Sequence, residues 1–78
     1  MRQLLPGLGD KIVEMIVRKD RHILVGDVCL DFSCSIEQAE FELEHLVEGG
    51  KIAELDREQL RKVGLKDVAS AYYLLPRR

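Results

Sequence analysis

The chain has no tryptophan, asparagine or threonine, and only two phenylalanines, two tyrosines and two cysteines among 78 residues. No apolar run approaches the ~18 residues of a membrane span, and no signal-peptide pattern is present. We therefore expect a cytoplasmic protein in which Cys29 and Cys34 remain reduced. The bias away from Asn and Thr, with 33% of the residues charged, is typical of proteins from hot environments.

The chain also lacks the patterns that indicate an enzyme or a metal site. No Walker loop, dinucleotide fingerprint or Ser-His-Asp spacing is present. A single domain of this length buries roughly 60% of its unfolded surface, which leaves little room for an active-site cleft. Glu42 and His45 have the Glu-x-x-His spacing of di-iron bundles, but only once, and the two cysteines lack the close pairing of zinc sites. We expect no catalytic residue, no metal or other cofactor and no small-molecule substrate.

The chain has no large excess of charge of either sign: its 12 basic and 14 acidic residues give a formal net charge of only −2. No global basic field therefore attracts nucleic acid or an anionic membrane. We expect no membrane binding, and any contact with DNA must come from a local basic patch.

The most informative segment is a predicted helix over residues 36–48. Ser35 is a good N-cap with Gln38 at the capping-box spacing, and Gly49 and Gly50 supply a C-terminal stop. At about 100° per residue, one stripe of this helix is apolar and is predicted to be buried. The stripe consists of Ile36, Ala39, Leu43, Leu46 and Val47. The opposite face is acidic with one exposed aromatic, and carries Glu37, Gln38, Phe41, Glu44, His45 and Glu48, flanked by Glu40 and Glu42.

Shorter elements are predicted on the N-terminal side of this helix. They are an arm over residues 1–9, a helix from its cap Asp10 to about Arg21, a strand over 22–25 and a brief helix over 26–32. The segment LPGLGDK at the start of the first helix also resembles the turn of helix-hairpin-helix domains. Only four residues precede it, however, and Asp10 would occupy the helix terminus where a phosphate would bind.

A hairpin is predicted on the C-terminal side. Residues 51–55 and 69–75 read as strands, with Tyr72 and Leu74 on the face opposite Tyr73 and a basic tail over residues 76–78. Asp56 and Gln59 have capping-box spacing, so a short helix is expected between the strands. It should be held against the body by Leu60, Val63 and Leu65.

Over roughly residues 10–75, the chain resembles the winged helix-turn-helix family, most closely the small stand-alone domains of archaea and bacteria. The segments LVEGGKI and YYLL, together with the apolar spacing from Val25 to Ile52, carry this resemblance. It implies an α+β fold with three helices and a small antiparallel β-sheet, here with an elongated wing. It also implies that the helix over 36–48 lies in a DNA major groove. The sequence departs from the family here, because DNA-reading members usually carry Arg, Lys, Ser, Thr or Asn on that face.

Two functional hypotheses follow, of which the family resemblance favours the first. The first is a transcription-regulator-like protein that binds double-stranded DNA weakly and mainly through its wing. Its contacts would be Arg57, Arg61, Lys62 and Lys66 in the wing, Arg18, Lys19 and Arg21 at the end of the first helix, and Arg77 and Arg78 in the tail.

The second hypothesis is a protein-interaction or dimerisation module. Phe41 in an acidic surround suggests a contact surface, because aromatics are enriched at the centre of interfaces. The outer face of the last strand is also expected to be covered, by the arm or by a second subunit. The candidate contacts are Glu37, Phe41, Glu44, His45, Glu48 and Tyr72.

Overall fold

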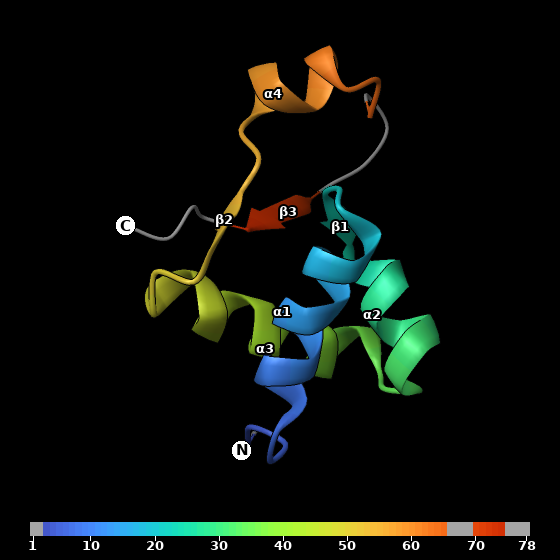
Figure 1. The fold of residues 1–78 in the computed structure, drawn as a ribbon, viewed down its shortest axis with the longest axis vertical. Coiled ribbons are helices and arrows are strands. Elements are labelled where there is room, and N and C mark those ends of the chain that lie inside the picture. Colours follow the sequence, from blue (N-terminus) through green and yellow to red (C-terminus); the bar gives the residue numbers. More distant parts are fainter. Residues whose placement is uncertain (1–2, 66–69, 75–78) are drawn as a thin grey trace.

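The computed structural model describes residues 3–65 and 70–74 (Figure 1). These residues form a small α+β fold of four helices and one three-stranded antiparallel sheet. The elements follow one another as α1 (Leu8–Lys19), β1 (Ile23–Leu24), α2 (Val25–Phe32), α3 (Ile36–Glu48), β2 (Ile52–Glu54), α4 (Arg57–Lys62) and β3 (Ala71–Leu74). The expected α+β class is therefore confirmed. The basic tail over residues 76–78 lies outside the described residues.

The sheet has the order β1-β3-β2, so its middle strand is β3. Ile23 pairs with Tyr72 on one side, and Ile52 pairs with Leu74 on the other. One further backbone bond, from Leu55 N–H to Ala71 O at 2.8 Å, extends the β2–β3 pairing toward α4. The second strand of the β2–β3 hairpin, which contains α4, therefore also pairs with β1.

Helix α1 begins two residues before the predicted Asp10 cap. Gly7, at φ 77°, occupies the left-handed region that favours glycine, and its carbonyl accepts from Lys11 N–H at 3.1 Å. Asp10 therefore lies in the first turn, where a carboxylate favours the helix dipole. The helix ends at Lys19, because Asp20 turns to φ 51° and its N–H bonds to Ile16 O and Val17 O.

The core lies where α1, α2 and α3 meet the sheet. Helix α1 contacts both α3 and β3, and α2 packs along α3. The buried apolar side chains are Leu8, Ile12, Met15 and Ile16 from α1, Ile23 from β1, Val28 from α2, Ala39, Leu43 and Leu46 from α3, Ile52 from β2, and Ala71 and Tyr72 from β3.

The buried face of α3 is rotated from the predicted stripe. Ala39, Leu43 and Leu46 are buried as expected, but Ile36 is 62% exposed and Glu42 is only 2% exposed. The arm explains this difference, because Leu5 N–H donates to Glu42 Oε2 at 2.7 Å.

Gln38 completes this contact, because its Nε2 donates both to Glu42 Oε2 and to Gln3 O, each at 2.9 Å. These hydrogen bonds offset the desolvation of the Glu42 carboxylate. Gln38 is therefore not available for the full capping box, and only the bond from Gln38 N–H to Ser35 Oγ, at 3.1 Å, caps the helix.

Helix α4 has the predicted capping box, but only part of the predicted packing. Asp56 Oδ1 accepts from Gln59 N–H at 2.8 Å, and Gln59 Oε1 accepts from Asp56 N–H at 3.0 Å. Leu60 and Leu65 are half-buried, but Val63 is 47% exposed, and no residue of α4 is fully buried. Figure 1 shows α4 at the end of the molecule opposite the N-terminus, beyond the sheet and apart from the helical body.

Candidate interaction site

A groove of about 720 Å³ lies between the outer side of α3, the start of α2 and the sheet. Its size is within the range of roughly 300 to 1,000 Å³ that is usual for ligand sites. It is lined by Leu24, Val25, Gly26, Ile36, Glu40, Glu44, Val47, Glu48, Glu54, Ser70 and Tyr72. We refer to these residues as the α3 groove.

Part of the lining of the α3 groove is apolar, and we call the side chains of Ile36, Val25, Val47 and Tyr72 its floor. Ile36, which α2 and α1 leave largely uncovered, stands beside the partly buried Val25 and Val47. Tyr72 closes the sheet side of the floor and is 5% exposed. An apolar surface held open in this way is typical of a binding groove.

The rim of the α3 groove is acidic. Glu40, Glu44 and Glu48 follow one another at a spacing of four residues on α3, and so lie along one side of that helix. Glu54 faces them from the end of β2. No Lys, Arg or His lines the groove among the described residues. Four carboxylates in one concave surface give it a negative potential.

The hydroxyl of Tyr72 has a raised pKa in this environment. Burial raises its pKa, and the nearby Glu54 carboxylate raises that pKa further, because both disfavour the phenolate anion. A hydrogen bond with the Ser70 side chain acts in the opposite direction, while Glu44 and Glu40 add smaller upward contributions.

The α3 groove brings together three of the six residues expected in a protein contact. Glu44 and Glu48 form its rim, and Tyr72 lies in its floor. The expectation that Tyr72 needs the arm or a second subunit to cover it is wrong, because Tyr72 belongs to the core cluster of its own chain. The predicted alternation of buried and exposed side chains along β3 is not observed, because both Ala71 and Tyr72 are buried at the middle of the sheet.

The other three expected contact residues lie elsewhere on α3. Phe41 is half-buried, not exposed as predicted, and does not line the groove. His45 is exposed on the arm side of α3, in a small hollow with Leu5 and Lys51. Glu37 is exposed in the first turn of the helix.

Sequence reasoning missed Ile36, Val47 and Glu54 as groove residues. The two apolar side chains were assigned to the core, and Glu54 is distant from α3 in sequence. The four-residue spacing of Glu40, Glu44 and Glu48 was visible, and was the one signal that could have indicated a continuous acidic edge.

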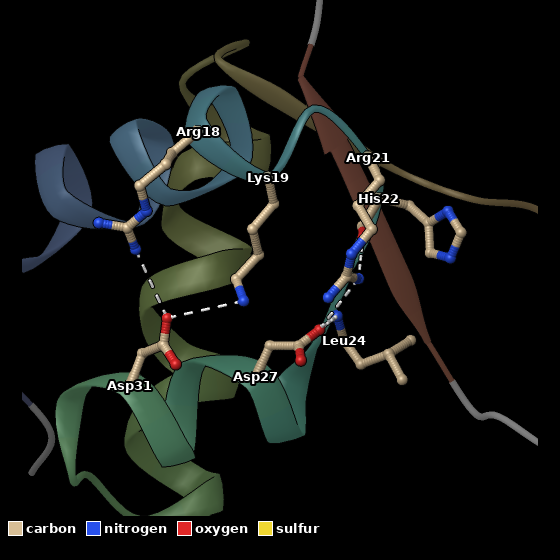
Figure 2. Close-up of polar contacts among 7 residues, drawn as sticks. All are labelled: Arg18, Lys19, Arg21, His22, Leu24, Asp27 and Asp31. Atoms are coloured by element: carbon tan, nitrogen blue, oxygen red, sulfur yellow. Dashed lines mark hydrogen bonds and ion pairs between the residues drawn. The ribbon is translucent and has the colours of Figure 1, made fainter.

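The cations at the end of α1 face carboxylates of α2 (Figure 2). Arg18 Nη2 and Lys19 Nζ lie 3.7 and 4.0 Å from Asp31 Oδ2. Arg21 Nη1 lies 3.7 Å from Asp27 Oδ2 and donates to His22 O at 2.9 Å. The sequence predicted these cations as DNA contacts, and the structure places each of them in an ion pair within the chain.

Asp27 has a second role at the start of α2. Its Oδ2 atom accepts from Leu24 N–H at 2.8 Å, as well as facing Arg21 (Figure 2). The carboxylate thus satisfies a backbone donor at the helix N-terminus while it neutralises a cation.

The cations of α4 have a different environment. Arg57, Arg61 and Lys62 are all exposed, and none forms an ion pair within residues 3–65 and 70–74. Lys66, Arg77 and Arg78, the remaining expected DNA contacts, lie outside the described residues. The structure therefore gives the domain an acidic groove and a separate helix with exposed cations.

The described residues contain no group of three or more His, Cys, Asp or Glu side chains that could hold a metal ion. Cys29 and Cys34 are free thiols, both half-buried near the α2–α3 turn. Among the described helices, none has the length and apolar character required to cross a membrane.

Comparison of the chain with protein-family models, curated proteins and solved structures finds no match.

Proposed function

We propose that this chain is a winged-helix-like protein-interaction module, and that the α3 groove receives a partner segment with apolar and cationic side chains. The observation that carries this proposal is the combination of an uncovered apolar floor at Ile36 with a rim of four carboxylates. An apolar side chain would fill the floor and exclude water. Cations beside it would pair with the rim, which favours rapid association and discriminates against anionic partners.

The element order supports the winged-helix part of this proposal. Three helices with a short strand after the first, followed by a hairpin whose last strand joins the middle of the sheet, have the layout expected of that family. In this layout α3 corresponds to the recognition helix and the segment around α4 to the wing. The α3 groove runs along α3, between that helix, the start of α2 and the sheet.

The same surface is unsuited to DNA. A duplex carries one phosphate charge per roughly 1.7 Å of its axis, so four groove carboxylates would repel it as α3 approached. Because α3 carries no Lys or Arg, it also cannot favour binding by releasing counterions from the DNA phosphates. The charge that excludes a nucleic acid from this surface attracts a basic peptide.

The direct test is binding of designed peptides, measured by fluorescence anisotropy. One helical peptide would carry leucines on one face and lysines on the other, and its matched peptide would have glutamates in place of the lysines. The lysine peptide should bind, and more weakly as salt is raised. Equal binding of both peptides, or of neither at low salt, would overturn the proposal.

Charge removal locates the site. The double variant Glu44→Gln, Glu48→Gln should weaken binding of the lysine peptide by roughly three- to thirty-fold, the loss of two exposed ion pairs. Glu14→Gln is the matched control, because Glu14 is exposed on α1 and does not line the groove. Equal effects of Glu14 and the groove glutamates would place the peptide elsewhere.

DNA binding through α4 is a second candidate, favoured by three exposed cations that have no ion-pair partner among the described residues. Such binding would involve phosphates alone, so it should be weakly specific, with a log-log salt slope near −0.9 per contact. Arg61→Glu with Lys62→Glu should abolish it, whereas Phe41→Ala should leave it intact and Glu44→Lys should leave it intact or strengthen it. Absence of duplex binding at low salt would exclude this candidate.

A further inference from the structure

We infer that the α3 groove of one molecule receives α4 of a second copy. The two copies thus form a reciprocal dimer, referred to below as the α4 exchange, in which α4 of each chain lies in the groove of the other. This inference rests on the proposed function, because it names one particular segment with the chemistry that the groove is proposed to accept. Its support is the complementarity between two surfaces of the same chain.

Helix α4 has the properties required of the groove's occupant. Arg57, Arg61 and Lys62 are exposed cations with no ion-pair partner in the described part of their own chain. Val63, the residue that follows the helix, is a large apolar side chain left 47% exposed. A short, basic helix with an uncovered apolar residue at its end is thus already present in the molecule.

The α3 groove provides the complementary set. Its rim offers four carboxylates for three cations, and Ile36, 62% exposed, offers an apolar contact for Val63. Within the described ranges, no α4 residue lines the groove, so a molecule's own α4 does not fill it. Both surfaces therefore remain available to another copy.

The position of α4 permits a closed dimer. The groove's sheet side is formed by Glu54 and Ser70, the described residues near the two chain segments that lead into and out of the α4 region. Groove and α4 thus belong to neighbouring parts of the molecule, with α4 standing beyond the sheet (Figure 1). A two-fold axis that brings α4 of one copy to its partner's groove also creates the reverse contact. The assembly then closes at two copies and does not extend into a filament.

A consequence of this exchange is competition. The dimer occupies the groove that would otherwise bind another protein, so a partner must displace α4 before it can bind. Binding of the lysine peptide should therefore weaken as protein concentration rises, because a larger fraction of the grooves is filled by a second copy.

The test is sedimentation velocity on single charge reversals. The wild-type chain should dimerise at low ionic strength and dissociate near 1 M salt, where the screening length is only about 3 Å. Glu44→Lys reverses a groove charge and Arg61→Glu reverses an α4 charge, and each should raise the dimer dissociation constant by at least about tenfold. Glu14→Lys and Lys11→Glu, at exposed positions of α1 outside the groove, are matched controls that should still dimerise.

An equimolar mixture of the two reversed variants gives the decisive result. The unchanged α4 of the Glu44→Lys chain meets the unchanged groove of the Arg61→Glu chain. In the reverse contact, the lysine introduced into one groove meets the glutamate introduced into the other chain's α4, so the charges are again opposite. The mixture should therefore form a heterodimer although each variant alone is monomeric. A monomeric wild-type chain at low salt, or a mixture that stays monomeric, would overturn the exchange.

Peptide anisotropy on the same samples separates the two proposals. A monomeric wild-type chain that binds the lysine peptide, and loses it in Glu44→Lys, would refute the dimer and leave the proposed function in place. A chain whose mixed variants recover the dimer, but which binds no lysine peptide even when diluted to monomer, would support the exchange and refute a groove that accepts other proteins.

Discussion

At the scale of single residues, Glu42 connects the arm to the helical body. Its carboxylate is almost fully buried and accepts hydrogen bonds from Leu5 N–H and Gln38 Nε2. A hydrogen bond to a charged group contributes about 1.5 to 3 kcal/mol. Glu42 thus contributes to the fold through its two hydrogen-bond partners.

We expect Glu42→Ala to lower the free energy of unfolding by about 1 to 3 kcal/mol, because Leu5 N–H and Gln38 lose their shared acceptor. Glu42→Gln should cost less, since it retains one carbonyl oxygen. Urea unfolding measures both changes. Glu40→Ala, at an exposed position of the same helix, should remain within about 0.5 kcal/mol of the wild type, and an equal loss at the two positions would contradict this role.

The titration of Tyr72 depends first on its burial and then on the carboxylates of the α3 groove. In a Tyr73→Phe background it is the single tyrosine, so ultraviolet titration follows its hydroxyl alone. Burial first, and Glu54 next, raise its pKa above the ordinary value near 10. We expect its titration midpoint in the folded chain to exceed that in urea, and Glu54→Gln to lower the folded midpoint. Identical midpoints with and without urea would contradict a buried tyrosine.

The sign of the linked change in stability follows from this direction. As pH rises past about 10, the tyrosine of the unfolded chain ionises first, while burial keeps Tyr72 protonated in the folded chain. The unfolded state therefore releases more protons, and the free energy of unfolding falls between the unfolded and the folded pKa of this residue. Below that interval Tyr72 makes stability neither rise nor fall with pH.

The two cysteines should act as inert thiols. Burial raises the pKa of Cys34, and the neighbouring Cys29 raises it further, so less of the reactive thiolate is present at neutral pH. We expect slow alkylation of Cys34 by iodoacetamide near pH 7, followed by mass spectrometry, and equal stability with and without a reducing agent. A large loss of stability on reduction would mean that the native protein contains a disulfide.

At the scale of elements, local chemistry predicted the helices well. Ser35 caps α3, and Asp56 with Gln59 begins α4, because these hydrogen bonds involve residues only three positions apart. The rotation of α3 could not be predicted in this way. Ile36 has the spacing of a core residue, and only the position of the arm beside Glu42 decides which side of the helix is covered.

The candidate site was predictable to a smaller extent. The acidic character of α3 was visible in the sequence, including Glu44 and Glu48. The groove itself depends on β2 and β3 reaching α3 from distant parts of the chain, which brings Glu54 and Tyr72 to its border. The pairing of Arg18 and Arg21 with α2 carboxylates was likewise hidden, because it depends on how two helices cross.

Ile36 separates binding from folding within one helix. It is 62% exposed, so Ile36→Ser should change the free energy of unfolding by no more than about 0.5 kcal/mol while it weakens binding of the lysine peptide. Leu43→Ala, in the core of the same helix, should instead cost about 2 to 5 kcal/mol. Urea unfolding and anisotropy on both variants check this. An Ile36→Ser variant that binds normally would show that the floor of the α3 groove is not used.

At the scale of the whole molecule, acidic and basic side chains are concentrated in different places although their numbers are nearly equal. The formal charge of −2 is a sum over the whole chain, which includes an acidic groove, an α1–α2 contact with ion pairs and a helix with exposed cations. Net charge therefore describes this protein poorly, because binding depends on the local potential.

The place of β3 in the sheet has a consequence for the order of folding. Ile23 and Ile52 belong to strands that do not pair with each other, and both pair with β3. During synthesis, the three helices of the body leave the ribosome before the strand that joins the sheet. Until residues 71–74 emerge, the nascent chain has two unpaired strand edges and lacks the Tyr72 side chain that fills its core. Completion of the sheet therefore requires contacts between distant parts of the chain, so we expect folding to be slower than for a purely helical bundle of this size.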